Sequence, residues 1–106
     1  MPNGKMGKMF KEMQKAQAKM AELQEELKGR TVEATSGGGA VRAVVSGGKE
    51  LQELEISPEL LKEDDVEMIQ DLVLSAVNEA IRQADAMVSA EMEKLAGGLG
   101  LPPNLL

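Results

Sequence analysis

Two long series of apolar residues at helical spacing constrain the fold of this chain more than any other feature. The first series lies near the N-terminus, and its steps of three and four residues are those of a heptad repeat. Its members are Met6, Met9, Met13, Ala16, Met20, Leu23 and Leu27. A helix over residues 4–27 is roughly 35 Å long at about 1.5 Å of rise per residue, and Gly29 follows as its C-terminal stop.

The second series predicts a longer helix, roughly 48 Å in length, in the C-terminal half of the chain. Asp64 stands in the cap position with Glu67 three residues further on, as in a capping box, and the predicted helix stops at Gly97-Gly98. A short helical turn over residues 59–62 precedes it, because Ser57 can cap a helix that has Pro58 in its first position. The members of this series are Val66, Ile69, Val73, Val77, Ala80, Ala84, Met87 and Leu95.

Between the helices, three short runs alternate apolar and polar residues, which predicts three β-strands. The alternating residues are Val32 and Ala34, then Val41, Ala43 and Val45, then Leu54 and Ile56. Glycine-rich turns at residues 37–39 and 47–49 separate the runs, so we expect an antiparallel meander. Leu51 is out of phase with the third run, so that strand either begins after Leu51 or contains a bulge. We interpret the triple glycine as a turn, because a phosphate-binding loop leads from a strand into a helix.

These elements predict a single α+β domain over residues 1–98, with a long N-terminal helix, a three-stranded antiparallel meander, a short helix and a long C-terminal helix. A sheet of about fifteen residues is expected to cover about half of each long helix, which leaves apolar stripes exposed in a monomer. We therefore expect a homodimer. Residues 99–106 contain two prolines and no charged side chain, and we expect a flexible C-terminal tail, with a packed strap as the alternative.

The composition excludes several kinds of functional site. The chain has no histidine and no cysteine, which removes the commonest general base, thiol nucleophiles, disulfides and the usual zinc ligands. Phe10 is the single aromatic residue, so one chain cannot build a row of stacking platforms for unpaired bases. We interpret Glu63-Asp64-Asp65 as a helix start, because it lacks the alternating ligands of a calcium loop. We expect no enzymatic activity, no cofactor, no metal ion and no small-molecule substrate.

No apolar run approaches the roughly 20 residues that a bilayer-spanning helix needs. The opening Met1-Pro2-Asn3-Gly4-Lys5 carries a charge but not the apolar core of a signal peptide. We therefore expect a cytoplasmic protein without a membrane anchor, and the absence of cysteine suits a reducing compartment.

Charge is distributed unevenly along the chain. The 12 basic and 18 acidic residues give a net charge of −6, yet residues 1–20 contain five lysines and one glutamate, a local charge of about +4. Four of these lysines cluster on one flank of the predicted helix, about a quarter turn from the apolar series. The candidate contacts to DNA phosphates are Lys5, Lys8, Lys11, Lys15 and Lys19. The alternative interpretation of this flank is a solvated helix face.

Several segments, in this order, resemble the YbaB/EbfC family of bacterial nucleoid-associated proteins. They are Met6-Gly7-Lys8-Met9-Phe10-Lys11-Glu12-Met13-Gln14-Lys15-Ala16-Gln17, Gly38-Gly39-Ala40-Val41, Leu54-Glu55-Ile56-Ser57-Pro58-Glu59-Leu60-Leu61, Asp71-Leu72-Val73 and Ala76-Val77-Asn78-Glu79-Ala80. The resemblance implies a tweezers-like homodimer whose protruding helices bind duplex DNA at the nucleoid and alter its conformation. This chain departs from the family in its acidic residues 63–65 and in a last helix with only Arg82 and Lys94 as bases, which argues against DNA contact by that helix.

Three hypotheses of function follow. The first is a homodimer that binds duplex DNA with little sequence specificity and organises the nucleoid or regulates genes, because lysine contacts phosphate as a point charge and reads base edges poorly. The alternative is a protein-interaction scaffold or small chaperone that uses the methionine-rich series, since thioether side chains repack easily. The third places the first helix on an anionic membrane surface, and Glu22, Glu25 and Glu26 weaken it.

Overall fold

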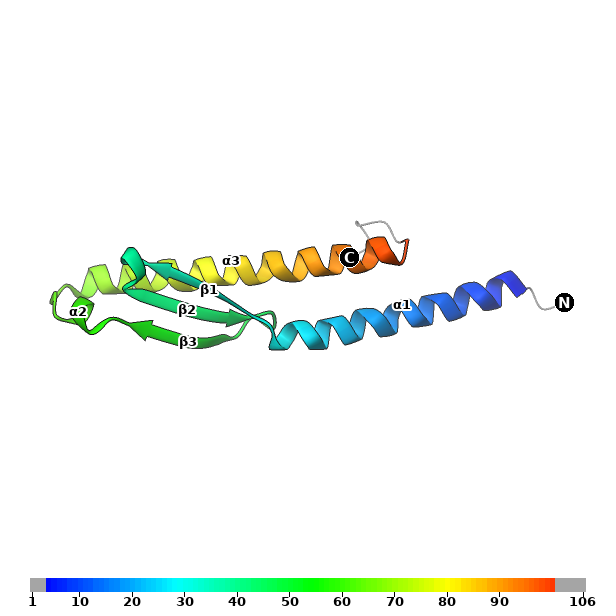
Figure 1. Cartoon of the computed structure of the whole chain (residues 1–106), viewed down its shortest axis with the longest axis horizontal. Coiled ribbons are helices and arrows are strands. Elements are labelled where there is room, and N and C mark those ends of the chain that lie inside the picture. The colour runs from blue at the N-terminus through cyan, green and yellow to red at the C-terminus, as the bar shows by residue number, and fades with distance from the viewer. Residues whose placement is uncertain (1–3, 101–106) are drawn as a thin grey trace.

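The computed structural model of the chain describes residues 4–100, with side chains from Met6 onward. It confirms the predicted order of elements (Figure 1). These are α1 (Gly4–Gly29), β1 (Thr31–Ser36), the 3₁₀ turn η1 (Gly37–Gly39), β2 (Val41–Ser46), β3 (Leu51–Ile56), α2 (Pro58–Leu61) and α3 (Val66–Gly98). The molecule is a rod of about 78 × 20 × 17 Å, because both long helices run along the same axis.

The three strands form an antiparallel meander in the order β1-β2-β3, as predicted. A bulge interrupts the pairing of β2 with β3, where Val44 lies opposite Glu53 and the next residue, Val45, lies opposite Leu51. Gln52 is thus the extra residue of the bulge. The third strand therefore begins at Leu51 and contains a bulge, and this bulge places Leu51 on the same face of the sheet as Leu54.

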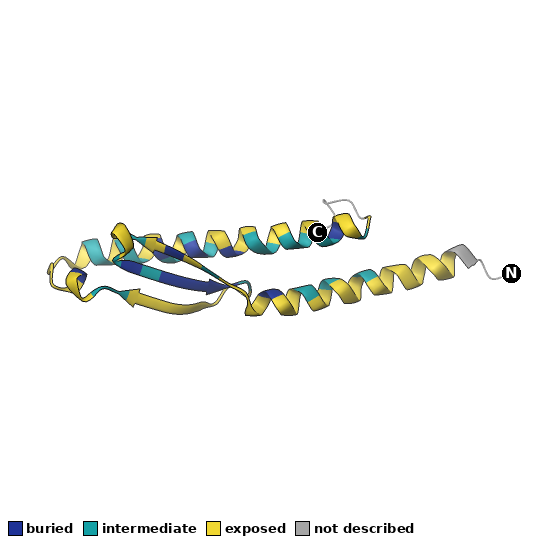
Figure 2. Ribbon diagram, viewed as in Figure 1, coloured by how far each residue is buried: buried dark blue, intermediate teal, exposed yellow. Residues whose placement is uncertain are grey.

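The core lies between α3 and one face of the sheet. Ala76, Ala80 and Ala84 are buried on α3, and their small side chains let the helix lie close to β1 and β2. The residues that they meet are Ala34, Val41, Ala43 and Val45. The edge strand β3 is different, because all of its residues except Ile56 are exposed (Figure 2).

The expectation that the sheet covers half of each long helix is wrong for α1. This helix leaves the end of the sheet and runs beside the C-terminal half of α3, and its N-terminal turns continue beyond the end of α3 (Figure 1). Leu27 is its one buried residue among those described, and Ala16, Met20 and Leu23 are half-buried. Arg30 alone connects α1 to β1, and one residue is too short a connection for α1 to fold back across the sheet.

The start of α3 differs by one residue from the predicted capping box. Asp65, not Asp64, is the N-cap, and its carboxylate accepts a hydrogen bond of 3.0 Å from the Met68 backbone N–H. Asp64 instead has a positive φ of 56°, a conformation that aspartate tolerates and that turns the chain from α2 into α3. At its other end, α3 includes Gly97 and Gly98, two residues more than predicted.

Residues 101–106, most of the predicted flexible tail, lie outside the described residues. Across residues 4–100, neither long helix nor the short one has the length and apolarity of a membrane-spanning segment.

Candidate nucleic-acid interface

Four exposed lysines lie along one flank of α1 and form what we call the lysine stripe. They are Lys8, Lys11, Lys15 and Lys19. Their steps of three, four and four residues keep them on one side of the helix over roughly 16 Å of its axis. No ion pair joins any of the four to another described residue. The stripe therefore presents four ammonium groups to solvent.

The other described basic side chains, apart from Lys62, are paired with carboxylates. The pairs are Lys28 with Glu25, Arg30 with Glu26 and Glu91, Arg42 with Glu33, Glu53 and Glu55, Lys49 with Asp85, Arg82 with Glu79, and Lys94 with Glu91. Within the described part of the chain, the lysine stripe is thus the one cluster of basic side chains without internal counterions.

The fifth predicted contact, Lys5, lies in the first turns of α1. Its side chain is outside the described residues. The structure therefore brings four of the five predicted lysines together on one helix flank and leaves the placement of the Lys5 side chain as a prediction.

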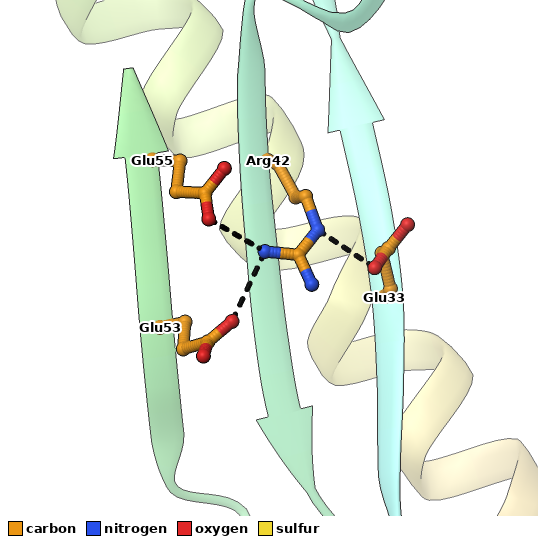
Figure 3. Close-up of polar contacts among 4 residues, drawn as sticks. All are labelled: Glu33, Arg42, Glu53 and Glu55. Carbon is orange, nitrogen blue, oxygen red and sulfur yellow. Dashed lines mark hydrogen bonds and ion pairs between the residues drawn. The ribbon is translucent and has the colours of Figure 1, made fainter.

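The face of the sheet opposite α3 is acidic and carries a network that the sequence analysis did not identify. Arg42 donates from Nε to Glu33 at 2.7 Å and from Nη1 to Glu53 and Glu55 at 3.0 Å each (Figure 3). A hydrogen bond to Glu33, the larger effect, and another to Glu53 raise the pKa of the Arg42 guanidinium. Three carboxylates surround one guanidinium, so the cluster keeps an excess of negative charge that repels a polyanion.

The register of the strands explains this network. Arg42 lies opposite Thr35 and Glu55. Val44, two residues further along β2 and so on the same face, lies opposite Glu33 and Glu53. All four charged side chains therefore fall on one face of the sheet. The period-2 alternation around Arg42 was the available signal, but it identifies partners only once the register is known.

Helix α3 offers no comparable basic surface. Its two bases form ion pairs within the helix, Arg82 with Glu79 at 2.7 Å and Lys94 with Glu91 at 3.5 Å. Hydrogen bonds from Arg82, the larger effect, and from Gln83 lower the pKa of Glu79. Both basic side chains of α3 are thus paired within the helix.

An apolar stripe lies beside the lysine stripe on α1. Its members, Met6, Met9, Phe10 and Met13, are each about 60% exposed. Part of this apolar stripe opens into a groove between α1 and the C-terminal end of α3, which we call the α1–α3 groove. The groove is lined by Met9, Glu12, Met13, Lys15, Ala16, Lys19, Gly98 and Leu99.

Among the described side chains, no three His, Cys, Asp or Glu residues are grouped so that they could hold a metal ion. The acidic residues 63–65 contribute the cap of α3 through Asp65. Positive charge without a described ion-pair partner is thus concentrated on α1, which projects from an acidic body.

Comparison with known proteins identifies the family of this chain. The family model described as the YbaB/EbfC DNA-binding family matches residues 2–99. The chain belongs to this family, which confirms the resemblance seen in the sequence.

Close relatives carry names that agree with the family. A "Nucleoid-associated protein" of Acetivibrio thermocellus is 54% identical over 102 residues, which are 96% of this chain and 90% of the relative. Another "Nucleoid-associated protein", from Pelotomaculum thermopropionicum, is 53% identical over 96% of this chain and 97% of its own length.

A solved structure supports the fold. The crystal structure of an uncharacterized protein from Helicobacter pylori matches with a TM-score of 0.59 and 28% sequence identity. The match covers 79% of this chain and 93% of that one.

Proposed function

We propose that this protein is a nucleoid-associated protein that binds duplex DNA through the lysine stripe of α1, as a homodimer and with little sequence specificity. The observation that carries the proposal is the absence of internal counterions along the stripe, in a chain whose other described bases, Lys62 excepted, are neutralised. Membership of a DNA-binding family and the names of the relatives support it. The activity is binding rather than catalysis, and the site of action is the nucleoid in the cytoplasm.

Low specificity follows from the chemistry of the stripe. Each ammonium group contacts a phosphate oxygen as a point charge, whereas base edges are read best by the bidentate groups of Arg, Asn and Gln. The stripe contains lysine only. Sequence-independent binding of this kind suits a protein that changes the conformation of DNA over many sites and so affects nucleoid organisation and gene expression.

The homodimer is supported by apolar surface on the side of the sheet that carries α3. Leu74 is 59% exposed on α3, and Val77, Ile81 and Val88 continue the same face of that helix at spacings of three, four and seven residues. On β3, Leu51 and Leu54 are 48% and 40% exposed. A second copy that covers this surface would direct two α1 helices from one body, as in the predicted tweezers.

Gel shifts with one duplex at several salt concentrations test the proposal. If the stripe neutralises phosphates, log K falls linearly with log salt by about 0.9 per contact. Two chains offer up to eight lysines, and we expect about half to engage, which gives a slope of roughly −3 to −5. Light scattering on the same sample should report twice the monomer mass of 11.3 kDa.

The decisive variant changes Lys11 and Lys15 to Gln. It should lower the affinity for every duplex sequence alike and flatten the salt slope, while the dimer stays intact. Lys62→Gln is the matched control, because Lys62 is also unpaired among the described residues but lies in the α2–α3 connection. A wild-type protein that does not bind duplex DNA at about 50 mM salt, or a double variant with an unchanged slope, would refute the proposal.

The exposed apolar stripe favours a second candidate function, a protein-interaction scaffold or small chaperone. Three thioether side chains and Phe10 on one helix can accept the apolar face of a partner helix. A Met9→Ser, Met13→Ser variant distinguishes the two functions. It should retain the salt-dependent binding of DNA if the lysine stripe acts alone, and it should abolish suppression of aggregation of a model client if the chaperone function is correct.

A further inference from the structure

The C-terminal turn of α1 packs on the turn between β2 and β3. Gly47 opens that turn, and its backbone N–H donates a hydrogen bond of 2.9 Å to the Arg30 carbonyl. A Cβ atom added to Gly47 would overlap the Leu27 carbonyl oxygen and would lie 3.3 Å from Cε of Met87 on α3. Leu27 itself is buried. Helix α1, the turn and α3 therefore meet at Gly47 with no room for a side chain.

Arg30 directly follows α1 and links it to α3. Its guanidinium is 2.7 Å from a carboxylate oxygen of Glu26 on α1 and 3.4 Å from one of Glu91 on α3. The Glu91 side chain is 24% exposed, the lowest fraction for any ion-paired carboxylate among the described residues. We call Leu27, Arg30, Gly47 and Glu91 the α1 joint.

We propose that the α1 joint positions the lysine stripe, because it sets the angle at which α1 leaves the body beside α3. Arg30, Gly47 and Glu91 are positioning residues in this arrangement, since none of them belongs to the stripe. The angle is a property of the protein without DNA, whereas its use in DNA binding rests on the proposed function.

The stripe lies far from the joint along α1. Lys8 is 19 residues from Leu27, or roughly 28 Å, so a tilt of about 10° at the joint moves the backbone at Lys8 by about 5 Å. Phosphates of one DNA strand follow each other at about 3.4 Å along the helix axis. A small change of angle therefore changes which phosphates the four lysines reach together.

Few other interactions hold the N-terminal part of α1. Among the described residues, no ion pair or side-chain hydrogen bond joins the part of α1 before Glu26 to the body. Ala16, Met20 and Leu23 are half-buried and supply apolar contact. The polar and steric constraints on the angle are thus concentrated at the joint.

Double electron–electron resonance on spin-labelled protein tests the joint without DNA. The chain has no cysteine, so Gln14→Cys on α1 and Ser89→Cys on α3 place one label on an exposed position of each helix. An excess of unlabelled chains ensures that any dimer contributes distances within one chain only. The wild-type joint should give one narrow distance distribution.

Gly47→Ala should displace α1, because the added methyl group overlaps the Leu27 carbonyl oxygen. A tilt of about 10° moves the backbone at Gln14 by about 3 Å, and we expect the mean distance to shift by about 2 Å. Gly29→Ala is the matched control. It is the same substitution at the end of α1, where a Cβ atom meets nothing within 4 Å, and it should leave the distance unchanged.

Glu91→Ala removes the ion pair that joins Arg30 to α3, and it should broaden the distance distribution while the helix content measured by circular dichroism is retained. The matched control is Glu93→Ala, since Glu93 is an exposed acid two residues further along α3 that pairs with no described base. If Gly47→Ala does not fold, the comparison of Glu91→Ala with Glu93→Ala decides.

Gel shifts with duplex DNA give a second measurement. Glu91→Ala removes a negative charge and frees Lys94, so charge alone predicts tighter binding. A displaced stripe predicts the opposite sign, and we expect Glu91→Ala to bind more weakly than Glu93→Ala. A wild type that does not bind duplex DNA would refute the proposed function, and the distances would then still support a joint that fixes the angle of α1.

The proposal is overturned if a folded Gly47→Ala or Glu91→Ala variant keeps the wild-type distance distribution. It is equally overturned if Gly29→Ala changes the distance as much as Gly47→Ala does, or if Glu91→Ala binds duplex DNA at least as tightly as Glu93→Ala.

Discussion

The two long helices of this protein are built from similar amphipathic sequences but have opposite environments. Helix α3 places an alanine ridge, Ala76, Ala80 and Ala84, against the sheet. Helix α1 has one buried residue, Leu27, in its described part, and its first ten described side chains are all exposed. Figure 2 shows this contrast along the length of the molecule. A regular apolar series therefore predicts that a helix forms, but it does not predict what the helix packs against.

The two helices also differ in their charge. Helix α1 carries six lysines and four glutamates, whereas α3 carries two bases and six acids. The bases of α3 are paired with acids one turn away, and those of the lysine stripe have no described partner. The helix that makes few contacts with the body is thus also the helix that carries the lysine stripe.

The largest expected effect comes from the same substitution made in each helix. Ala80→Leu inserts three carbon atoms where Ala80 is fully buried against the sheet, and it should lower the free energy of unfolding by about 3 kcal/mol. Ala18→Leu on the exposed side of α1 should change it by less than about 0.5 kcal/mol. Urea denaturation followed by circular dichroism measures both, since the chain has no Trp or Tyr. Equal losses in the two variants would mean that α1 is packed as tightly as α3.

A smaller effect concerns the basic residues of α3. Because Arg82 and Lys94 already bond to Glu79 and Glu91, changing both to Gln should leave the slope of log K against log salt within about one of the wild-type value. The Lys11→Gln, Lys15→Gln variant serves as the positive control. A flatter slope for the α3 variant, measured in the same gel-shift series, would place DNA contacts on both helices.

The smallest expected effect is a change in one pKa on α3. Hydrogen bonds from Arg82 and Gln83 lower the pKa of Glu79 below its ordinary value of 4.5. A lowered pKa in the folded state means that the interaction stabilises the protein above the unfolded-state pKa, and that this contribution is lost as the pH falls through the folded-state pKa. Arg82→Gln should therefore raise the Glu79 pKa toward its ordinary value.

A carboxyl ¹³C titration measures this change. Gln83→Ala should raise the same pKa by less, because the hydrogen bond from Arg82 is the larger cause. A Glu79 pKa that stays unchanged in the Arg82 variant would show that the ion pair does not form in solution. The effect on stability is small, since exposed ion pairs contribute little.

Much of the fold could be predicted because its signals are local. The heptad spacing up to Leu27, the alternation around Ala43 and the Ser57-Pro58 start of α2 each depend on neighbouring residues. One detail was predicted wrongly and another was left open. Asp65 caps α3 in place of Asp64 because Asp64 has the positive φ that turns the chain. The bulge at Gln52 required the register of β2 with β3.

The candidate site, too, could be predicted from the sequence only in part. The lysine stripe follows from helical periodicity alone, so the sequence was sufficient to place Lys8, Lys11, Lys15 and Lys19 on one flank. That these lysines have no described carboxylate partner, whereas Arg42 has three, depends on the register of the strands and on the direction in which α1 leaves the sheet.

The sequence by itself determined the order of elements, the basic flank of α1 and the exclusion of histidine and cysteine chemistry, because composition and periodicity act within one or two turns of chain. Only the tertiary structure decided that α3 covers the sheet while α1 projects beyond it. The connection after Gly29 is a single residue, Arg30, so α1 cannot turn back over strands that α3 already covers. The lysine stripe is left exposed for this reason.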